Sequence, residues 1–126
     1  MDRHGTRLRA RDVTIHYWLE RSNSVFLAVD GVNLDVHEGE FLSIVGPSGC
    51  GKSTFVHAVD GLLPISGGSL TLNGRVINRP GRDRAMVFQQ PNLLPWRTVM
   101  GNVVYGLELQ GRPMGEARKH AEHFIE

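Results

Sequence analysis

One glycine-rich stretch of this sequence combines small, flexible residues with a lysine and hydroxyl side chains, a set that can bind an anion. It consists of Gly46, Pro47, Ser48, Gly49, Cys50, Gly51, Lys52, Ser53 and Thr54. The stretch fits G-x-x-x-x-G-K-[ST], the pattern of a phosphate-binding P-loop. Glycines let the backbone turn tightly and bring its N–H groups against a polyphosphate. At these positions Lys52 could reach the β- and γ-phosphates of a nucleotide, and the Ser53 hydroxyl could bind Mg²⁺.

The segments on either side are those that such a loop needs. Residues 40–45 are short and mostly apolar, which predicts a strand. Over 54–62, apolar residues recur at helical spacing, which predicts a helix that ends near Gly61. A strand, a glycine loop and a helix N-terminus together make an anion site, because the helix dipole and its free N–H groups favour negative charge.

Strands are predicted both before and after this centre. Residues 13–18 are β-rich, and residues 27–36 follow a polar turn and alternate apolar with polar side chains, the period of a half-buried strand. Residues 69–77 predict a hairpin with the favoured two-residue turn Asn73-Gly74. Residues 84–88 predict a further strand.

Helices are predicted in the last part of the chain. From Thr98 onward, Val99, Val103 and Leu107 are spaced four apart, and residues 115–126 form a second, more polar helical pattern. In that helix His120 and His123, near Glu116 and Glu122, suggest a metal site. Because such sites need three or four converging ligands, a solvated helix face is the favoured interpretation.

Composition limits the class of protein. The chain has 126 residues, a formal charge of +1 and 40% hydrophobic residues, which describes one globular domain or a piece of one. The even charge balance argues against nucleic acid as a partner. Cys50 is the only cysteine, so no intrachain disulfide forms, and a reducing compartment is expected. No apolar run approaches the roughly 20 residues of a membrane span. The arginine-rich N-terminus, with Arg3, Arg7, Arg9 and Arg11, is expected to be a solvated tail.

Together these features resemble the ATP-binding subunit of an ABC transporter, from about Val13 to the end of the chain. The motifs that carry the resemblance follow that family's order: an aromatic in the first strand, residues 28–34, the P-loop, Ser66-Gly67-Gly68, Asn73-Gly74 and Val87-Phe88-Gln89. The run 88–99 with Asn102-Val103 is similar to the importer branch that takes up nitrate, sulfonates or taurine.

The resemblance implies ATP and Mg²⁺ as cofactors and assigns two residues outside the P-loop. Tyr17 matches the aromatic that stacks on adenine; the alternatives are an aromatic packed in the core, or Trp18 as the stacking residue. Gln89 matches the glutamine that meets Mg²⁺ and the attacking water, with Gln90 as the second choice. An amide suits that task because it can accept from water and coordinate a cation without adding charge.

The fold class implied is α/β, a P-loop NTPase core with an N-terminal antiparallel β-subdomain and the start of a helical subdomain. The expected parts are about 11–97 and about 98–126 of a single nucleotide-binding domain. That family also needs a signature motif, an Asp-Glu pair and a switch histidine after the glutamine, and this sequence has none of them. Residues 65–69 imitate the signature but are predicted to open a strand. The expectation is therefore an N-terminal part that contains no catalytic residue of its own.

The partners implied are a second nucleotide-binding subunit, giving a homodimer, and a membrane permease at the cytoplasmic face of the membrane. Leu93, Leu94 and Trp96 form an apolar loop that would dock the permease; the alternative is that the leucines pack into their own domain. Two other functions stay open. A P-loop kinase would need an arginine-rich lid after the P-loop helix, where the hairpin 69–77 is predicted instead. The second open function is that of a short protein that binds nucleotide without hydrolysing it.

Overall fold

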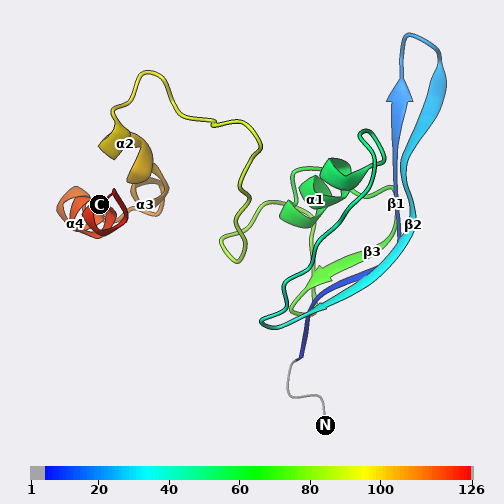
Figure 1. Cartoon of the computed structure of the whole chain (residues 1–126), viewed down its shortest axis with the longest axis horizontal. Helices are drawn as coiled ribbons and strands as arrows, with labels where there is room; N and C mark the ends of the chain where they lie inside the picture. The colour runs from blue at the N-terminus through cyan, green and yellow to red at the C-terminus, as the bar shows by residue number, and fades with distance from the viewer. Residues whose placement is uncertain (1–4, 126) are drawn as a thin grey trace. The chain divides into compact units, whose positions relative to one another are not determined.

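A long antiparallel hairpin is the framework of the first part of the chain (Figure 1). In the computed structural model, which describes residues 5–125, β1 (Thr6–Leu19) pairs with β2 (Ser24–His37) along its whole length. On its other side β1 pairs antiparallel with β3 (Gly67–Leu72), which continues into β4 (Arg75–Val76). The sheet order is β2-β1-β3-β4. The predicted N-terminal antiparallel sheet is confirmed.

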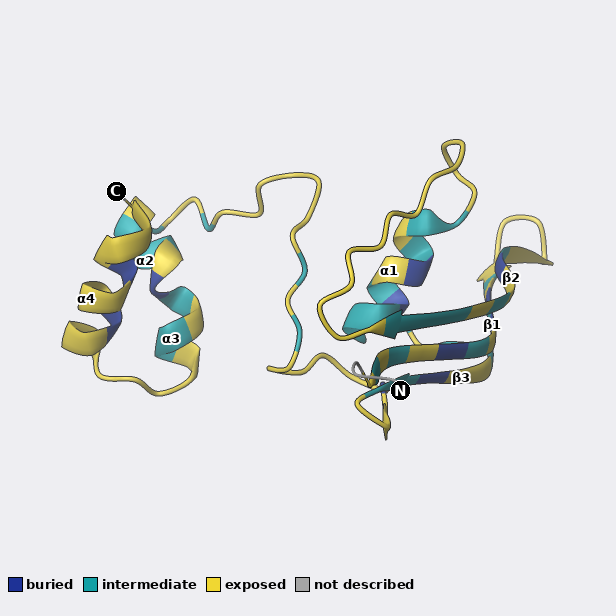
Figure 2. Ribbon diagram, turned by 60° about the horizontal axis from the view of Figure 1, so that its bottom comes forward, coloured by how far each residue is buried: buried dark blue, intermediate teal, exposed yellow. Residues whose placement is uncertain are grey.

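The core of this part lies between the sheet and one helix, α1 (Lys52–Asp60) (Figure 2). β1 contributes Ala10, Val13 and Ile15, all essentially inaccessible to solvent, and α1 contributes Phe55 and Ala58. Because successive strand residues point to opposite faces, the three β1 residues cannot all follow strict alternation; a shift in pairing between Ala10 and Val13 brings them to one face.

The start of β1 corrects the expectation of a solvated arginine tail. Arg7, Arg9 and Arg11 alternate with Leu8 and Ala10, and this period of two places the apolar side chains on the core face. The arginines then project from the other face, so their charge is compatible with a strand. Arg3 lies outside the described residues.

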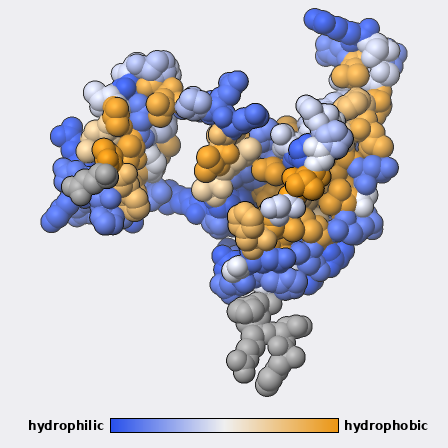
Figure 3. Space-filling model, in the orientation of Figure 1, coloured by the Kyte–Doolittle hydropathy of each residue, from blue (hydrophilic) through white to orange (hydrophobic). Residues whose placement is uncertain are grey.

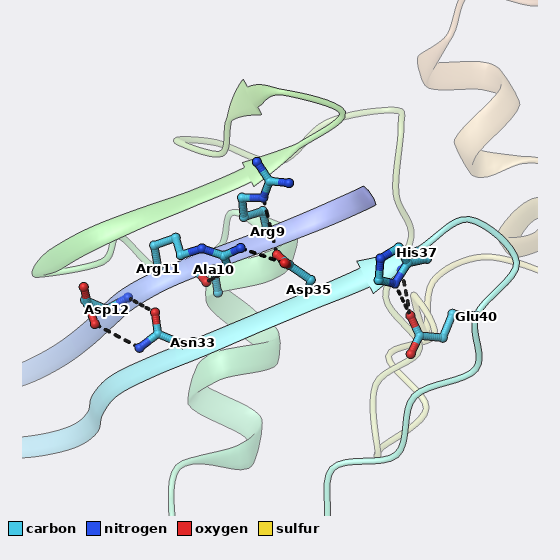
Figure 4. Close-up of polar contacts among 8 residues, drawn as sticks. All are labelled: Arg9, Ala10, Arg11, Asp12, Asn33, Asp35, His37 and Glu40. Atoms are coloured by element: carbon cyan, nitrogen blue, oxygen red, sulfur yellow. Dashed lines mark hydrogen bonds and ion pairs between the residues drawn. The ribbon is translucent and has the colours of Figure 1, made fainter. Parts of the chain in front are cut away.

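One acidic residue of β2, Asp35, meets two of these arginines (Figure 4). Arg11 donates to Asp35 at 2.6 Å and Arg9 donates to the same carboxylate at 3.4 Å. The hydrogen bond from Arg11 lowers the pKa of Asp35 below its ordinary value. Next to this pair, the Asn33 side chain accepts from the Asp12 backbone N–H at 3.0 Å and donates to the Asp12 carboxylate at 2.9 Å. Asp12 lies at the point where the pairing of β1 with β2 shifts. Side chains of the outer face thus fix the register of β1 against β2.

Two of the predicted strands are absent. Residues 40–45 and 84–88 carry no ladder pairing, and Phe41 and Val87 are 93% and 96% exposed. A strand is held by hydrogen bonds to a neighbour, and a parallel strand is normally covered on both faces. Among residues 5–125 neither segment has such a neighbour. The prediction of strands at 40–45 and 84–88 is therefore wrong for the described residues, because apolar composition alone supplies no partner strand.

The turns and helix ends of this part agree with the sequence. β3 and β4 are joined by Asn73 and Gly74, both with positive φ, as the favoured two-residue turn requires. α1 ends at Gly61, whose left-handed conformation closes the helix with a hydrogen bond to Ala58.

A second compact unit begins at Val87 and contains three helices, α2 (Val99–Val103), α3 (Tyr105–Leu109) and α4 (Met114–Ile125). The predicted helix after Thr98 is interrupted at Val104, and its predicted apolar face is wrong in part, because Val99 and Val103 are exposed. The residues packed together are Met100, Val104, Leu107, Ala117 and Ala121. The alanines of α4 are small enough to bring its backbone close to Val104, which decides the buried face.

The segment 79–84 is tied to the end of α1 by Arg84. Its largely buried guanidinium donates to the Asp60 carbonyl at 3.2 Å and to the Arg79 carbonyl at 2.6 Å. The Asp60 carbonyl is one of the last of the helix, which have no partner within it. A cation there also opposes the negative end of the helix dipole.

We expect Arg84→Met to lower the free energy of unfolding by about 1–3 kcal/mol, because the Asp60 and Arg79 carbonyls lose their charged donor. Urea unfolding followed by circular dichroism measures this. The matched control is Arg82→Met at an exposed position, expected within about 0.5 kcal/mol of the parent. Equal effects of the two substitutions would show that the guanidinium contacts do not stabilise the fold.

Candidate functional site

The glycine-rich stretch leads directly into α1, as the sequence predicts. α1 begins at Lys52, and Gly51 caps it with φ of +99°. A Cβ atom at Gly51 would lie 2.2 Å from the Ala28 carbonyl oxygen of β2. Only glycine therefore lets the helix start this close to the sheet.

The N-terminus of α1 is open to an anion. Within the described chain, no side chain caps its first N–H groups, and its first turn contains no acidic residue. Helices usually satisfy these N–H groups with a Ser, Thr, Asp or Asn side chain. Where that side chain is missing, the N–H groups and the helix dipole attract negative charge. A phosphate group fits this position.

Lys52 folds back over the loop that precedes it. Its ammonium donates to the carbonyl oxygens of Gly46 and Pro47, both at 2.7 Å, and lies 3.5 Å from the sulfur of Cys50. The loop therefore surrounds a positive charge. Phosphate oxygens bind an ammonium more strongly than neutral carbonyls do, because both partners are then charged. Ser53, the predicted Mg²⁺ ligand, is exposed at the next position.

Tyr17 and Trp18 lie on opposite faces of the hairpin. Tyr17 pairs with Phe26 and packs partly against the core that contains Phe55 of α1, whereas Trp18 is 60% exposed. The face of Tyr17 is thus the face that α1 covers. Of the two aromatics, Tyr17 has the position compatible with a ligand at the start of α1, and it also belongs in part to the core, as the alternative interpretation expected.

An apolar cavity of about 450 Å³ lies beside the P-loop. β2 lines it with Leu27, Val29, Val32 and Leu34, and Phe55 of α1 closes one side. Cys50, Gly51 and Lys52 also contribute to its wall. Apolar side chains gather on the visible surface of this unit (Figure 3). The sequence does not reveal the cavity, because its walls come from separate segments; the alternating apolar residues of β2 are the one signal that points to it.

Gln89 belongs to the second unit and lies exposed at a bend, so its meeting with the P-loop stays a prediction. In the same unit Trp96 is 77% exposed and Leu93 is also exposed, whereas Leu94 is half-buried. The interpretation that both leucines pack into their own domain therefore holds only in part, for Leu94.

No metal-binding cluster of three or more His, Cys, Asp or Glu side chains occurs in residues 5–125. His120 and His123 instead each place an imidazole ring edge-on against Phe124, with centroids 5.3 Å apart. Nor does any helix in this part of the chain have the length and apolar character to cross a membrane.

The sequence matches the family model described as ABC transporter over residues 29–126. It is 43% identical to an uncharacterized ABC transporter ATP-binding protein of Methanocaldococcus jannaschii, over 98% of this chain and 46% of that protein. It is 46% identical to a taurine import ATP-binding protein of Rhizobium johnstonii, over 75% of this chain and 36% of that protein. The chain thus spans about half or less of the length of these relatives.

Solved structures give the same result for the fold. An ATP-binding cassette in a dimeric post-hydrolysis state bound to ADP and Pi superposes with a TM-score of 0.79 at 31% identity. The match covers 92% of this chain and 54% of that cassette.

We expect Gly51→Ala to lower the free energy of unfolding by more than about 2 kcal/mol, since it combines a left-handed conformation with a clash against β2. Thermal unfolding measures this. The matched control is Gly49→Ala, where φ is +80° but a Cβ atom meets nothing within 4 Å; only the conformational cost of about 1–2 kcal/mol is expected. If Gly49→Ala proved the more damaging, the contact with Ala28 would not control the site.

Proposed function

The chain belongs to the ABC transporter family, and from that premise we propose that it binds Mg-ATP as part of the energy-coupling ATPase subunit of an importer. The observation that carries the proposal is the uncapped N-terminus of α1, with Lys52 turned into the loop before it. The loop supplies positive charge and unsatisfied N–H groups, and a nucleotide polyphosphate supplies the matching negative charge.

Different residues of the site bind different parts of the nucleotide. The P-loop, from Gly46 to Thr54, holds the phosphates, and Lys52 exchanges its two carbonyl acceptors for β- and γ-phosphate oxygens. The Ser53 hydroxyl is a ligand of Mg²⁺, which neutralises charge on the phosphates when it is bound. Tyr17 stacks on the adenine. Gln89 would be a second Mg²⁺ ligand.

The transported solute and the assembly are inferred from the relatives. Proteins similar to this chain include taurine import ATP-binding proteins, which supports an importer for small solutes such as nitrate, sulfonates or taurine. The similar solved cassettes are described as dimeric, which supports a homodimer. In this assembly residues of about 11–97 form the β-subdomain and P-loop core, and those from about 98 begin the helical subdomain. ATP hydrolysis belongs to the complete subunit. A small P-loop kinase has no remaining support.

The proposed contact with the permease is the loop after Gln89, at the cytoplasmic face of the membrane. Leu93 and Trp96 are exposed apolar side chains there, and tryptophan is enriched among the residues that carry interface energy. Leu94, although half-buried, stands between them. An apolar segment of the permease would cover these side chains.

The nucleotide assignment is tested by titration calorimetry of the variants Lys52→Ala and Tyr17→Ala with ATP and AMP. Loss of the charged hydrogen bonds of Lys52 should weaken ATP binding about 10- to 150-fold and AMP binding much less. Loss of stacking at Tyr17 should cost about 1–3 kcal/mol with both nucleotides.

Inorganic tripolyphosphate, which has no base, is the control ligand: its binding should depend on Lys52 and not on Tyr17. If Lys52→Ala lost equal affinity for ATP and AMP, the phosphate site would not be centred on this lysine. If Trp18→Ala instead lost the affinity expected for Tyr17→Ala, the adenine site would be assigned to the other face of the hairpin.

The docking assignment is tested with Trp96→Ala in the complete gene product. We expect ATP affinity to be unchanged and affinity for the permease to fall about 30-fold or more, because truncation of an anchoring tryptophan costs about 2 kcal/mol or more. Pull-down with the detergent-solubilised permease measures this. Trp18→Ala, at the other exposed tryptophan, is the control and should leave the yield unchanged. Unchanged yield for Trp96→Ala, with a lower melting temperature, would place this side chain in the core of the subunit.

A further inference from the structure

The exposed Trp96 stands on a tight turn. The Arg97 N–H donates to the Leu94 carbonyl at 3.0 Å, which closes a four-residue β-turn over residues 94–97. Pro95 occupies the second position of the turn, where its ring fixes φ near the value that common turns need. Trp96 follows at the third position, 77% exposed. The backbone conformation therefore determines the direction in which the tryptophan projects.

One side chain of α2 holds both ends of this turn. The Asn102 amide oxygen accepts from the Leu94 N–H at 2.7 Å. Its amide nitrogen donates to the Leu94 carbonyl at 3.2 Å, to the Arg97 carbonyl at 3.3 Å and to the Thr98 carbonyl at 2.9 Å. Asn102 thus pairs with Leu94 in both directions and reaches the carbonyl groups on the far side of the turn.

Few side chains can make this set of contacts. A carboxamide offers one acceptor oxygen and two donor hydrogens, whereas a carboxylate of the same shape only accepts. An aspartate here would keep the bond from the Leu94 N–H and place negative charge against three carbonyl oxygens. The set of contacts therefore requires asparagine at this position. Formation of a short helix alone would not require it.

Arg97 fastens the last residue of the turn to α3. Its guanidinium donates to Glu108 at 2.6 Å and lies 4.6 Å from the centroid of the Tyr105 ring. The hydrogen bond from Arg97 lowers the pKa of Glu108. Leu94 and Arg97 are both half-buried, so the two ends of the turn face the helices while Trp96 faces solvent.

We propose that Asn102 is the positioning residue of a docking turn: it holds residues 94–98 in the shape that presents Trp96 before the permease binds. This inference rests on the proposed function, in which Trp96 meets the permease. A surface that already has its bound conformation loses less conformational entropy on association, and the competent fraction of molecules sets the apparent affinity. Asn102 touches no nucleotide in this scheme and acts through the geometry of Trp96 alone.

The test uses the complete gene product with Trp18→Phe and with any tryptophan outside residues 1–126 also replaced by Phe, so that Trp96 is the one tryptophan that fluoresces. Time-resolved fluorescence anisotropy reports the nanosecond motion of Trp96 without a partner. Asn102→Ala and Asn102→Asp should enlarge the amplitude of that motion. The association rate with detergent-solubilised permease should fall roughly 3- to 10-fold for both variants, with unchanged ATP affinity.

Thr98→Ala is the matched control. The Thr98 hydroxyl accepts from the Gly101 N–H at 3.0 Å and so caps α2, but its side chain makes none of the Asn102 contacts. This variant weakens the same helix and should leave the motion of Trp96 unchanged. If Asn102 acted only through the stability of α2, Thr98→Ala and Asn102→Ala would have the same effect, and the inference would be overturned.

Two further results separate this inference from the proposed function. Unchanged Trp96 motion in Asn102→Ala, with weak permease binding by Trp96→Ala, would overturn the positioning role and leave the docking assignment intact. Increased Trp96 motion in Asn102→Ala, with full permease binding by Trp96→Ala, would overturn the docking assignment instead.

Discussion

The close approach of α1 to β2 is the constraint on which the candidate site depends. Gly51 places the start of the helix against the backbone of Ala28, and that contact fixes where the uncapped N–H groups of α1 point. The sheet behind it is held in register by polar contacts on its outer face, above all Arg11 with Asp35. The candidate site for a polyanion thus depends on two features that do not themselves bind an anion: the missing Cβ atom of Gly51 and the pairing of β1 with β2.

Much of this arrangement could be predicted from the sequence because its determinants are local. The P-loop pattern, the turn at Asn73-Gly74 and the helix stop at Gly61 each act within a few residues, and the structure has all three elements where they were expected. β1 was predicted too short, because the arginines of its first half were interpreted as a tail. Their alternation with Leu8 and Ala10 was the stronger signal, since period, and not charge, decides whether a segment can pair.

What the sequence could not predict is non-local. Residues 40–45 and 84–88 have strand composition, but in the described part of the chain no neighbouring strand forms a ladder with them. In the helical unit, the buried face was decided by the small alanines of α4, far along the chain from Val104. The hydrogen bonds of Asn102 belong to the same class: the resemblance included the residue, but nothing in the spacing of side chains indicated that its amide would bind the backbone on both sides of Trp96.

The segment that carries Gln89 runs between two anchored points. Arg84 binds the end of α1 in the unit that contains the P-loop, and Leu94 is bound by Asn102 in the unit that contains Trp96. The described residues between them belong to no strand. Gln89 thus lies in a segment without strand pairing, between the bound residues Arg84 and Leu94. Under the proposed function, this segment is the direct chain connection between the residues assigned to the nucleotide and those assigned to the permease.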